Sequence, residues 1–412
     1  MPMIQPFKGL RPAEGRADDV VAPPYDVMNA AEARDMAQGR PWSFLHISRP
    51  EIDLPEGTDP YASEVYAKAR ENLDRMIDEG VLVRDSKPCY YAYRLTMGEH
   101  VQTGLVAAAS VEAYDADRIK KHEYTRPVKE NDRVRQIEAL NAQTGPVFLV
   151  YRANAVVDEV LSGVSRQQPD VDVTARDGVR HEIWVIEDDK RIDALTSAFD
   201  AMDALYVADG HHRSASASRV AGARRESSPD QAGEASWNYF LSVIFPDNQM
   251  QILDYNRVIK DLAGLTPQAF LERVAAIFTV TESATPVKPA APGEFGMYLD
   301  GSWYRLTLPP DQIPDDPVES LDVSLLANNL IAPILGITDQ RTDDRIDFVG
   351  GIRGLEGLMQ RVDSGEMAVA FSLPPTSMQA LMAVADAGEV MPPKSTWFEP
   401  KLADGLVSHV LD

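Results

Sequence analysis

The stretch Tyr206-Val207-Ala208-Asp209-Gly210-His211-His212-Arg213 is a short apolar run that ends in a turn and continues into small, helix-favouring residues. It predicts a strand over Ala204–Ala208, a turn at Gly210 and a helix that begins near Ser214. The first backbone N–H groups of a helix have no partner inside the helix, and they attract anions. The stretch therefore predicts an anion site at the junction of strand and helix.

Each polar residue of this turn has a candidate role. Gly210 permits a positive φ or the close approach of a ligand, and Arg213 can form a bidentate fork to phosphate. Asp209 could hold Mg²⁺ or a ligand hydroxyl, and His211 and His212 could donate to phosphate, act as general acid or base, or bind a metal. The alternative is structural, with Asp209 capping the helix and both histidines on the surface.

A second segment, residues 118–135, concentrates positive charge in an otherwise acidic chain. It contains these basic residues: Arg118, Lys120, Lys121, Arg126, Lys129, Arg133 and Arg135. We expect a loop here, because Pro127 interrupts a long helix, followed by a helix that begins near Asn131. The predicted phosphate clamps are Lys121, Arg126, Lys129 and Arg133, and Glu123 is a candidate base. The alternative is that these charges pair with the interleaved acids on a solvated surface.

The overall composition limits the possible partners. The chain has 412 residues, 64 acids and 40 bases, which give a formal net charge of -24. Such a chain repels nucleic acid except at a local basic patch, so a small polyanion fits the basic segment better. Cys89 is the only cysteine, which excludes an intrachain disulfide. We expect neither a signal peptide nor a membrane span, and hence a cytoplasmic protein.

Periodicity along the chain predicts a mixture of helices and hairpins. The apolar spacing over Pro60–Gly80 predicts an amphipathic helix, and Tyr90–Leu95 with Val101–Val111 predicts a hairpin. Further strands are expected over Pro146–Tyr151 and Ile183–Ile186. A second hairpin is expected over Met297–Leu306, where Asp300-Gly301 favours a type I′ turn. These elements predict an α+β fold with a mixed sheet, hairpins and flanking helices.

The length suggests two domains. Residues 224–236 and 281–296 have the composition of surface connections, and the second of these is rich in proline. We therefore expect a phosphate-binding region over residues 1–280. A C-terminal α/β subdomain, beginning with the second hairpin, is expected over residues 281–412.

Three further clusters are weaker candidates for contacts with a substrate. Tyr25 and Asp26 follow two prolines in a rigid turn. Residues 43–49 alternate like a strand and include His46, for which a packed position in the core is the simpler interpretation. Lys394 and Ser395 lie in an extended segment that could close over a ligand or simply dock as a tail.

Several of these motifs occur together in one known family. The motifs are Ala22-Pro23-Pro24-Tyr25-Asp26-Val27, Phe44-Leu45-His46, His122-Glu123-Tyr124-Thr125, Lys129 with Asp132-Arg133, Gly145-Pro146-Val147-Phe148, Ala208-Asp209-Gly210-His211-His212-Arg213 and Met391-Pro392-Pro393-Lys394-Ser395-Thr396. In this order they resemble the family catalogued as domain of unknown function 1015, over nearly the whole chain.

The strand and turn at 206–213 also resemble the phosphate-binding box of the ParB/sulfiredoxin superfamily, which includes a free-serine kinase. That resemblance implies a ParB/sulfiredoxin-like core in which Gly210, His212 and Arg213 contact phosphate and Asp209 contacts the acceptor or Mg²⁺. His211 stands where sulfiredoxin has its catalytic cysteine, which argues against sulfinic-acid repair. The chain also lacks an evident DNA-binding helix-turn-helix, so the kinase branch is the nearest.

The resemblance implies a small-molecule kinase that transfers phosphoryl from ATP or ADP to the hydroxyl of a small metabolite such as free serine. Glu123 would be the base, His212 and Asp209 would take part in catalysis, and Mg²⁺ would accompany the nucleotide. One alternative is a nucleotide-binding or nucleotide-hydrolysing switch that phosphorylates no metabolite. Another is a metal hydrolase on His122, His211 and His212. The sequence leaves the acceptor, the donor nucleotide and the oligomeric state open.

Overall fold

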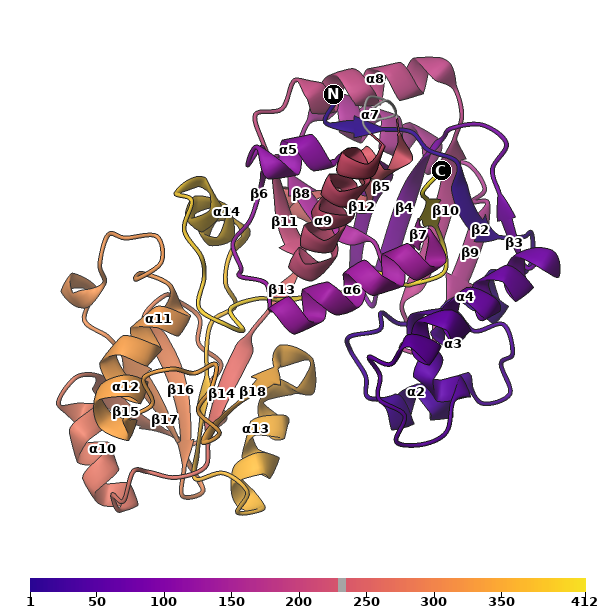
Figure 1. Cartoon of the computed structure of the whole chain (residues 1–412). Coiled ribbons are helices and arrows are strands. Elements are labelled where there is room, and N and C mark those ends of the chain that lie inside the picture. Colours follow the sequence, from indigo (N-terminus) through magenta and orange to yellow (C-terminus); the bar gives the residue numbers. More distant parts are fainter. Residues whose placement is uncertain (229–234) are drawn as a thin grey trace. The chain divides into compact units, whose positions relative to one another are not determined.

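The computed structural model describes residues 1–228 and 235–412, and these form two compact units. The first unit comprises Met1–Met250 with Pro400–Asp412, and the second comprises Gln251–Glu399 (Figure 1). The proline-rich stretch that suggested a boundary at residue 281 joins two strands of one sheet, because β15 (Thr279–Ser283) and β16 (Glu294–Leu299) both pair with β17 (Ser302–Thr307). The division that the structure shows therefore lies at residue 250 and again at residue 400.

The described residues of the first unit build a nine-stranded mixed sheet in the order β6-β11-β8-β12-β5-β4-β10-β9, with β1 added to β5. Its strands are β1 (Ile4–Gln5), β4 (Tyr90–Met97), β5 (His100–Ser110), β6 (Ile119–Lys120), β8 (Val147–Tyr151), β9 (Val171–Thr174), β10 (Arg180–Ile186), β11 (Leu205–Asp209) and β12 (Tyr239–Pro246). The β6–β11 and β8–β12 pairs are parallel and the others are antiparallel. The predicted α+β fold with a mixed sheet is confirmed.

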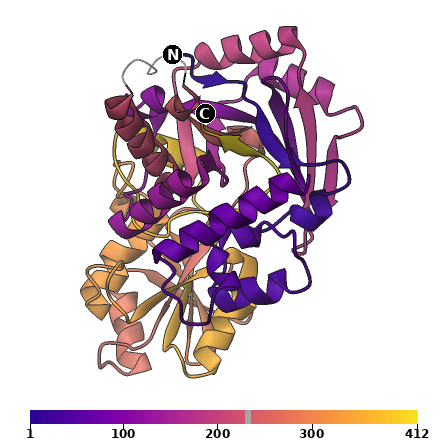
Figure 2. The ribbon, with the colours of Figure 1, turned by 45° about the vertical axis from the view of Figure 1, so that its right-hand side comes forward.

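One of the described helices of the first unit carries the second half of the basic segment. These helices are α1 (Ala17–Val20), α2 (Ala30–Ala37), α3 (Leu45–Ser48), α4 (Ser63–Asp78), α5 (Val111–Asp115), α6 (Pro127–Leu140), α7 (Ala155–Val164), α8 (Asp189–Asp200) and α9 (His211–Ser227). Helix α6 packs against both α4 and α9 (Figures 1 and 2). The predicted helix over Pro60–Gly80 is confirmed as α4, whose buried face includes Val65, Ala69 and Leu73. The packing of α6 on α9 brings the basic segment beside the turn at 209–213.

A smaller sheet of the first unit joins the two ends of the chain. It has the order β3-β2-β21-β7, with β2 (Gly9–Pro12), β3 (Leu82–Arg84), β7 (Ala142–Gln143) and β21 (Ser408–Val410). An isolated antiparallel bridge between Ala22 and Asp404 adds a further contact between the N-terminal and C-terminal segments. The C-terminal residues thereby reach the Tyr25 turn.

Three local predictions were wrong in detail. Residues 43–49 contain the short helix α3 in place of a strand, because Phe44, Leu45 and Ile47 are all buried and no alternation between core and solvent exists. Helix α6 begins at Pro127, where the missing N–H needs no partner. Helix α9 begins at His211, three residues earlier than expected. It continues to Ser227 and so includes the first part of the connection predicted at 224–236. Residues 229–234 of that connection lie outside the described residues.

The second unit has its own six-stranded sheet among the described residues, in the order β15-β17-β16-β19-β14-β18. Its further strands and helices are β13 (Ile252–Leu253), β14 (Tyr255–Ile259), β18 (Ile346–Gly350), β19 (Val369–Ser372), β20 (Trp397–Phe398), α10 (Pro267–Ala275), α11 (Asp322–Leu326), α12 (Ala332–Leu335), α13 (Gly354–Asp363) and α14 (Met378–Asp386). The predicted hairpin is present as β16 and β17, with φ of 49° at Asp300 and 78° at Gly301. Positive φ at both residues is the geometry of a type I′ turn.

Candidate functional site

The strand, turn and helix predicted at residues 204–214 are present in the first unit. Strand β11 ends at Asp209, and α9 begins at His211. Gly210 has a φ of 98°, and a Cβ at this position would lie 3.3 Å from the backbone Cα of Val147. A glycine is therefore required here both for its conformation and for the close approach of β8.

Arg213, in the first turn of α9, points back toward β8. Its Nη1 donates to the carbonyl of Pro146 at 2.9 Å, and its Nη2 donates to Asp26 at 3.0 Å. Burial disfavours the cation, but Asp26, Tyr25 and Asp209 outweigh this and raise the pKa of Arg213. The guanidinium is thus a permanent, oriented cation.

Arg133, on α6, meets the same aromatic ring as Arg213. The guanidinium carbon lies 3.9 Å from the Tyr25 ring centroid for Arg133 and 5.3 Å for Arg213. Arg133 also forms an ion pair of 2.7 Å with Asp132, whose other oxygen accepts the Tyr66 hydroxyl at 2.8 Å. The two cations that the sequence placed on separate segments therefore flank one tyrosine.

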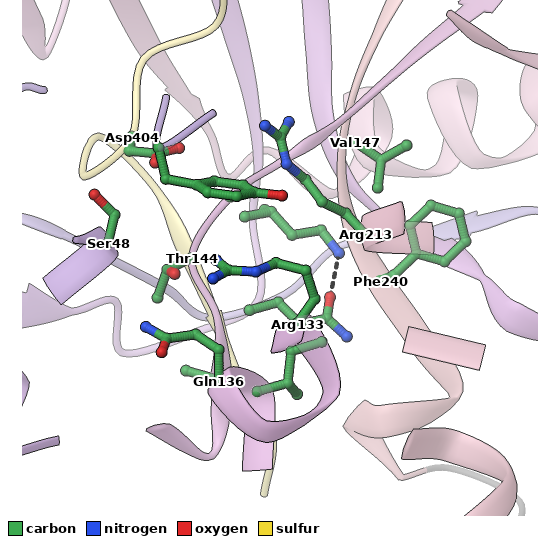
Figure 3. A pocket seen from close by; sticks show the side chains of 14 residues that line it. Ser48, Arg133, Gln136, Thr144, Val147, Arg213, Phe240 and Asp404 are labelled. Carbon is green, nitrogen blue, oxygen red and sulfur yellow. Dashed lines mark hydrogen bonds between the residues drawn. The ribbon is translucent and has the colours of Figure 1, made fainter. Parts of the chain in front are cut away.

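Arg133 and Arg213 line a common pocket of the first unit (Figure 3). The residues that line this pocket are Tyr25, Ser48, Arg133, Gln136, Ile137, Ala142, Gln143, Thr144, Gly145, Val147, Arg213, Phe240, Leu241 and Asp404. We call it the Arg133–Arg213 pocket. One residue of the basic segment and one residue of the turn thus line the same cavity.

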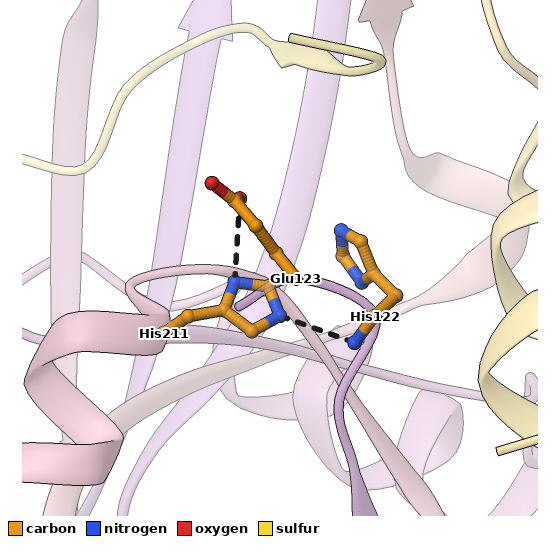
Figure 4. A group of neighbouring side chains, drawn as sticks. All are labelled: His122, Glu123 and His211. Atoms are coloured by element: carbon orange, nitrogen blue, oxygen red, sulfur yellow. Dashed lines mark hydrogen bonds and ion pairs between the residues drawn. The ribbon is translucent and has the colours of Figure 1, made fainter. Parts of the chain in front are cut away.

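His211, at the start of α9, lies beside His122 and Glu123 (Figure 4). The backbone N–H of His122 donates to Nε2 of His211 at 3.4 Å, and Nδ1 of His211 lies 3.8 Å from Glu123. Burial lowers the pKa of His122 to about 4 and that of His211 well below its usual range. Both rings are therefore neutral at neutral pH and add no positive charge to the site.

This group also has the residue types of a metal site, since one ligand atom from each of His122, Glu123 and His211 lies within 4.8 Å of the others. Nε2 of His211 accepts the hydrogen bond from the backbone N–H of His122. The ring proton of the neutral imidazole is therefore on Nδ1, which faces Glu123. A nitrogen that carries a proton has no lone pair for a metal. A metal held by this group would therefore have to displace the proton on Nδ1 of His211, which lies 3.8 Å from the Glu123 carboxylate.

His212 and Asp209 complete the turn. Nε2 of His212 accepts the backbone N–H of Arg126 at 2.9 Å, which fastens the start of α6 to the start of α9. Burial would raise the pKa of Asp209, but Lys401 and Arg213 lower it overall, and Lys401 Nζ lies 3.2 Å from its Oδ2. The role of Asp209 as a Mg²⁺ ligand stays a prediction, and it requires the Lys401 ammonium to leave.

The remaining predicted clamps point elsewhere. Lys121 lies 4.5 Å from the Tyr114 ring and 3.7 Å from Asp117, and Lys129 lies 5.9 Å from the Tyr61 ring. Arg126 approaches the turn through its backbone. None of these three is among the described residues that line the Arg133–Arg213 pocket.

Three of the weaker candidates have structural partners. His46 bonds to Asp53 at 2.8 Å and to the carbonyl of Arg40 at 3.1 Å, which fixes α3 in place. In the second unit, Lys394 lies 5.7 Å from the Tyr255 ring, and Ser395 donates to the carbonyl of Pro392 at 2.7 Å. Contacts of Lys394 or Ser395 with a substrate stay predictions.

Sequence reasoning missed Lys401 and Asp404, and it included Ser48 only within the weaker cluster at residues 43–49. Ser48 and Asp404 line the pocket, and Lys401 pairs with Asp209. Of the two missed residues, only Asp404 carried a signal, as a lone acid in the apolar run Leu402-Ala403-Asp404-Gly405-Leu406-Val407, but an Asp-Gly pair also indicates an ordinary turn.

A family profile described as "Protein of unknown function (DUF1015)" matches residues 4–324. The chain belongs to this family. The turn at 209–213 and the basic segment lie within the matched range, whereas the returning segment that carries Lys401 and Asp404 lies beyond it. No curated protein matches the chain.

Several solved structures are similar to this DUF1015 protein at low identity. A free serine kinase in complex with AMP is 15% identical over 72% of this chain and 86% of its own, with a TM-score of 0.34. SbnI with a C-terminal truncation, from Staphylococcus aureus, is 12% identical over 72% and 84%, with a TM-score of 0.37. A conserved hypothetical protein from Pyrococcus furiosus is 17% identical over 74% and 94%, with a TM-score of 0.35. Among the described helices, none is long and apolar enough to cross a membrane.

Proposed function

We propose that this DUF1015 protein is a small-molecule kinase that transfers a phosphoryl group from ATP or ADP to the hydroxyl of a small metabolite such as free serine. The observation that supports it most is that Arg133 and Arg213 line one pocket beside the start of α9. Two guanidinium groups and the first turn of a helix form a strong cradle for phosphate oxygens. The resemblance of the 206–213 box to a superfamily that contains a free-serine kinase points in the same direction.

The nucleotide phosphates occupy the start of α9 in this proposal. Gly210 supplies the positive φ that turns the end of β11 into the start of α9, where the first backbone N–H groups of the helix meet the phosphate. The imidazole of His212 and the guanidinium of Arg213 contact the phosphate oxygens, and Arg133 neutralises the charge that develops on the transferred group. Because the Tyr25 ring lies 3.9 Å from the guanidinium carbon of Arg133 and 5.3 Å from that of Arg213, the cations are positioned before the nucleotide arrives.

The transfer itself needs one base. The acceptor hydroxyl oxygen attacks the terminal phosphorus, the bond from that phosphorus to the nucleotide oxygen breaks, and the hydroxyl proton passes to the carboxylate of Glu123. The products are a phosphate ester and the nucleotide shortened by one phosphate. Glu123 suits this role because it is half exposed and His211 holds its carboxylate by a polar contact of 3.8 Å.

Mass spectrometry tests the proposal directly. The purified protein is incubated with Mg²⁺ and ATP or ADP, together with L-serine, L-threonine, D-glycerate or glycerol, and the products are searched for phosphate esters. A nucleotide-dependent ester with any acceptor supports a kinase. Nucleotide that is bound or hydrolysed without an ester refutes it and favours the switch, and tightly bound zinc or iron would instead favour a metal hydrolase.

A further inference from the structure

Three side chains that line the Arg133–Arg213 pocket each have a buried polar atom without a hydrogen-bond partner among the described residues. They are Oγ of Ser48, Nε of Arg213 and Oδ1 of Asp404. The exposed fraction is 5% for Ser48, 2% for Asp404 and 10% for the Arg213 side chain. Buried polar groups are nearly always paired in folded proteins, because an unpaired one forfeits its hydration. Three such atoms around one cavity require polar partners from outside the chain, which water or a polar ligand supplies.

Nε of Arg213 and Oδ1 of Asp404 face the same point. A Cβ built on Gly145 would lie 3.4 Å from Nε of Arg213 and 3.6 Å from Oδ1 of Asp404. Gly145 has no positive φ, so its missing side chain keeps space open and serves no special backbone conformation. A group of a few atoms placed over Gly145 can therefore touch both charges.

The neighbouring contacts hold both charged groups in these orientations. The backbone of Asp404 pairs with Ala22 at 2.9 Å and 3.2 Å, and its carboxylate accepts the backbone N–H of Tyr25. The two terminal nitrogens of Arg213 are bound to Pro146 and Asp26, which leaves Nε directed at the cavity. Figure 3 shows Ser48, Asp404 and Arg213 around the same opening.

The pairing of a carboxylate with a guanidinium selects the charge pattern of the ligand. On the Gly145 side of Arg213, phosphate alone fits poorly, because Asp404 would repel it. A group that is cationic at one end and anionic at the other satisfies both. Burial raises the pKa of Asp404 to about 7, so an ammonium ligand would stabilise its ionised form.

We propose that the Arg133–Arg213 pocket binds the zwitterionic head of a free α-amino acid, with the ammonium on Asp404 and the carboxylate on Arg213 Nε. The hydroxyl of Ser48 supplies a further hydrogen bond. This inference rests on the proposed function, for which it names the acceptor class as a hydroxy amino acid. It assigns the acceptor to the Gly145 side of Arg213 and leaves the nucleotide at the start of α9.

Calorimetry without nucleotide tests the class of ligand. The probes are L-serine, D-glycerate, which lacks the ammonium, ethanolamine, which lacks the carboxylate, and inorganic phosphate. We expect L-serine to bind at least about tenfold more tightly than any of the other three, because each of them leaves one buried charge unpaired. Equal affinity for glycerate or phosphate would overturn the inference, as would failure of every amino acid to bind either alone or with ADP present.

Two variants test the site. Asp404→Asn keeps the shape and removes the charge, and it should weaken L-serine binding by about tenfold or more while changing D-glycerate binding little. Gly145→Ala should weaken L-serine binding because the methyl group enters the space between the two charges. Gly163→Ala is the matched control, since a Cβ there contacts nothing within 4 Å and the residue lies in α7, away from the pocket.

The result separates this inference from the proposed function. If L-serine binds and both pocket variants weaken it, but no ester forms with any nucleotide, the amino-acid site stands and the kinase fails. If an ester forms only with glycerate or glycerol, the kinase stands and the amino-acid site fails. Should Asp404→Asn not fold, as judged by circular dichroism, unchanged L-serine binding by Gly145→Ala still overturns the assignment.

Discussion

Arg133 and Tyr25 stack with 3.9 Å between the guanidinium carbon and the ring centroid. Arg213 contacts the same ring at 5.3 Å. Both cations thus lie against one aromatic ring, with Asp132 and Asp26 as their ion-pair partners. The stack fixes the geometry of the pocket before any ligand enters.

Replacing Tyr25 tests this preorganisation. Tyr25→Ala should weaken nucleotide binding by about tenfold, since a cation–π contact contributes about 0.5–2 kcal/mol. Tyr25→Phe keeps the ring and should bind nucleotide like the wild type. Calorimetry with ADP compares the two, and a Phe variant as weak as the Ala variant would show that the hydroxyl, and not the ring, matters.

Arg213 should be indispensable for the nucleotide. Arg213→Ala removes the cation that borders both Gly210 and Gly145, and we expect ADP binding to fall below detection by calorimetry. The matched control is Arg219→Ala, on the exposed side of the same helix, where the guanidinium pairs with Glu130 at 2.8 Å. Unchanged affinity in Arg213→Ala would remove this residue from the phosphate site.

Glu123 should affect the chemical step more than binding. Glu123→Gln cannot accept the hydroxyl proton, and we expect turnover to fall by about a hundredfold or more with ADP affinity retained. Glu226→Gln, at an exposed position of α9, is the control and should turn over normally. A Gln variant of Glu123 with full activity would mean that another group takes the proton.

Gly210 should contribute to the stability of the fold as well as to binding. Gly210→Ala forces an alanine to a φ of 98° and brings its Cβ to 3.3 Å from Val147 Cα. The conformational strain alone should lower the free energy of unfolding by about 1–2 kcal/mol, as measured by urea denaturation. Gly163→Ala, where a Cβ meets open space, should not be destabilised, and equal effects in the two variants would contradict this account.

Stability should fall as the pH is lowered below about 6.5, because several histidines are buried in the neutral form. Burial lowers the pKa of His181 from 6.5 to about 4, and its Nδ1 lies 2.7 Å from the Tyr93 hydroxyl. Between these values the unfolded chain binds the proton and the folded protein does not, so protonation favours unfolding. The contribution of His181 is complete above pH 6.5 and is lost as the pH falls toward 4.

Protonation of His181 in the unfolded chain should lower the free energy of unfolding by about 2 kcal/mol when the pH falls from about 7.5 to about 5. His181→Gln should flatten the pH profile by that amount, whatever its stability at the higher pH. Urea denaturation at both pH values gives the difference. A variant with the same slope as the wild type would mean that His181 is protonated in the folded state.

The sequence by itself determined the elements whose signal is local. Helix α4, the two hairpins and the strand and turn at 206–210 follow from side-chain periodicity, Asp-Gly turn chemistry and the freedom of a glycine, all of which act over a few residues. The basic segment and the turn were also evident as candidates, since their charge contrasts with a chain of net charge -24.

Only the tertiary structure decided what these candidates face. The packing of α6 on α9 directs Arg133 to Tyr25 and leaves Lys121 and Lys129 with other partners. The bridge between Ala22 and Asp404 brings a carboxylate from the far end of the chain into the pocket. Such contacts depend on which distant segments share a sheet or a core, and residues far apart in sequence leave no local pattern that records the pairing.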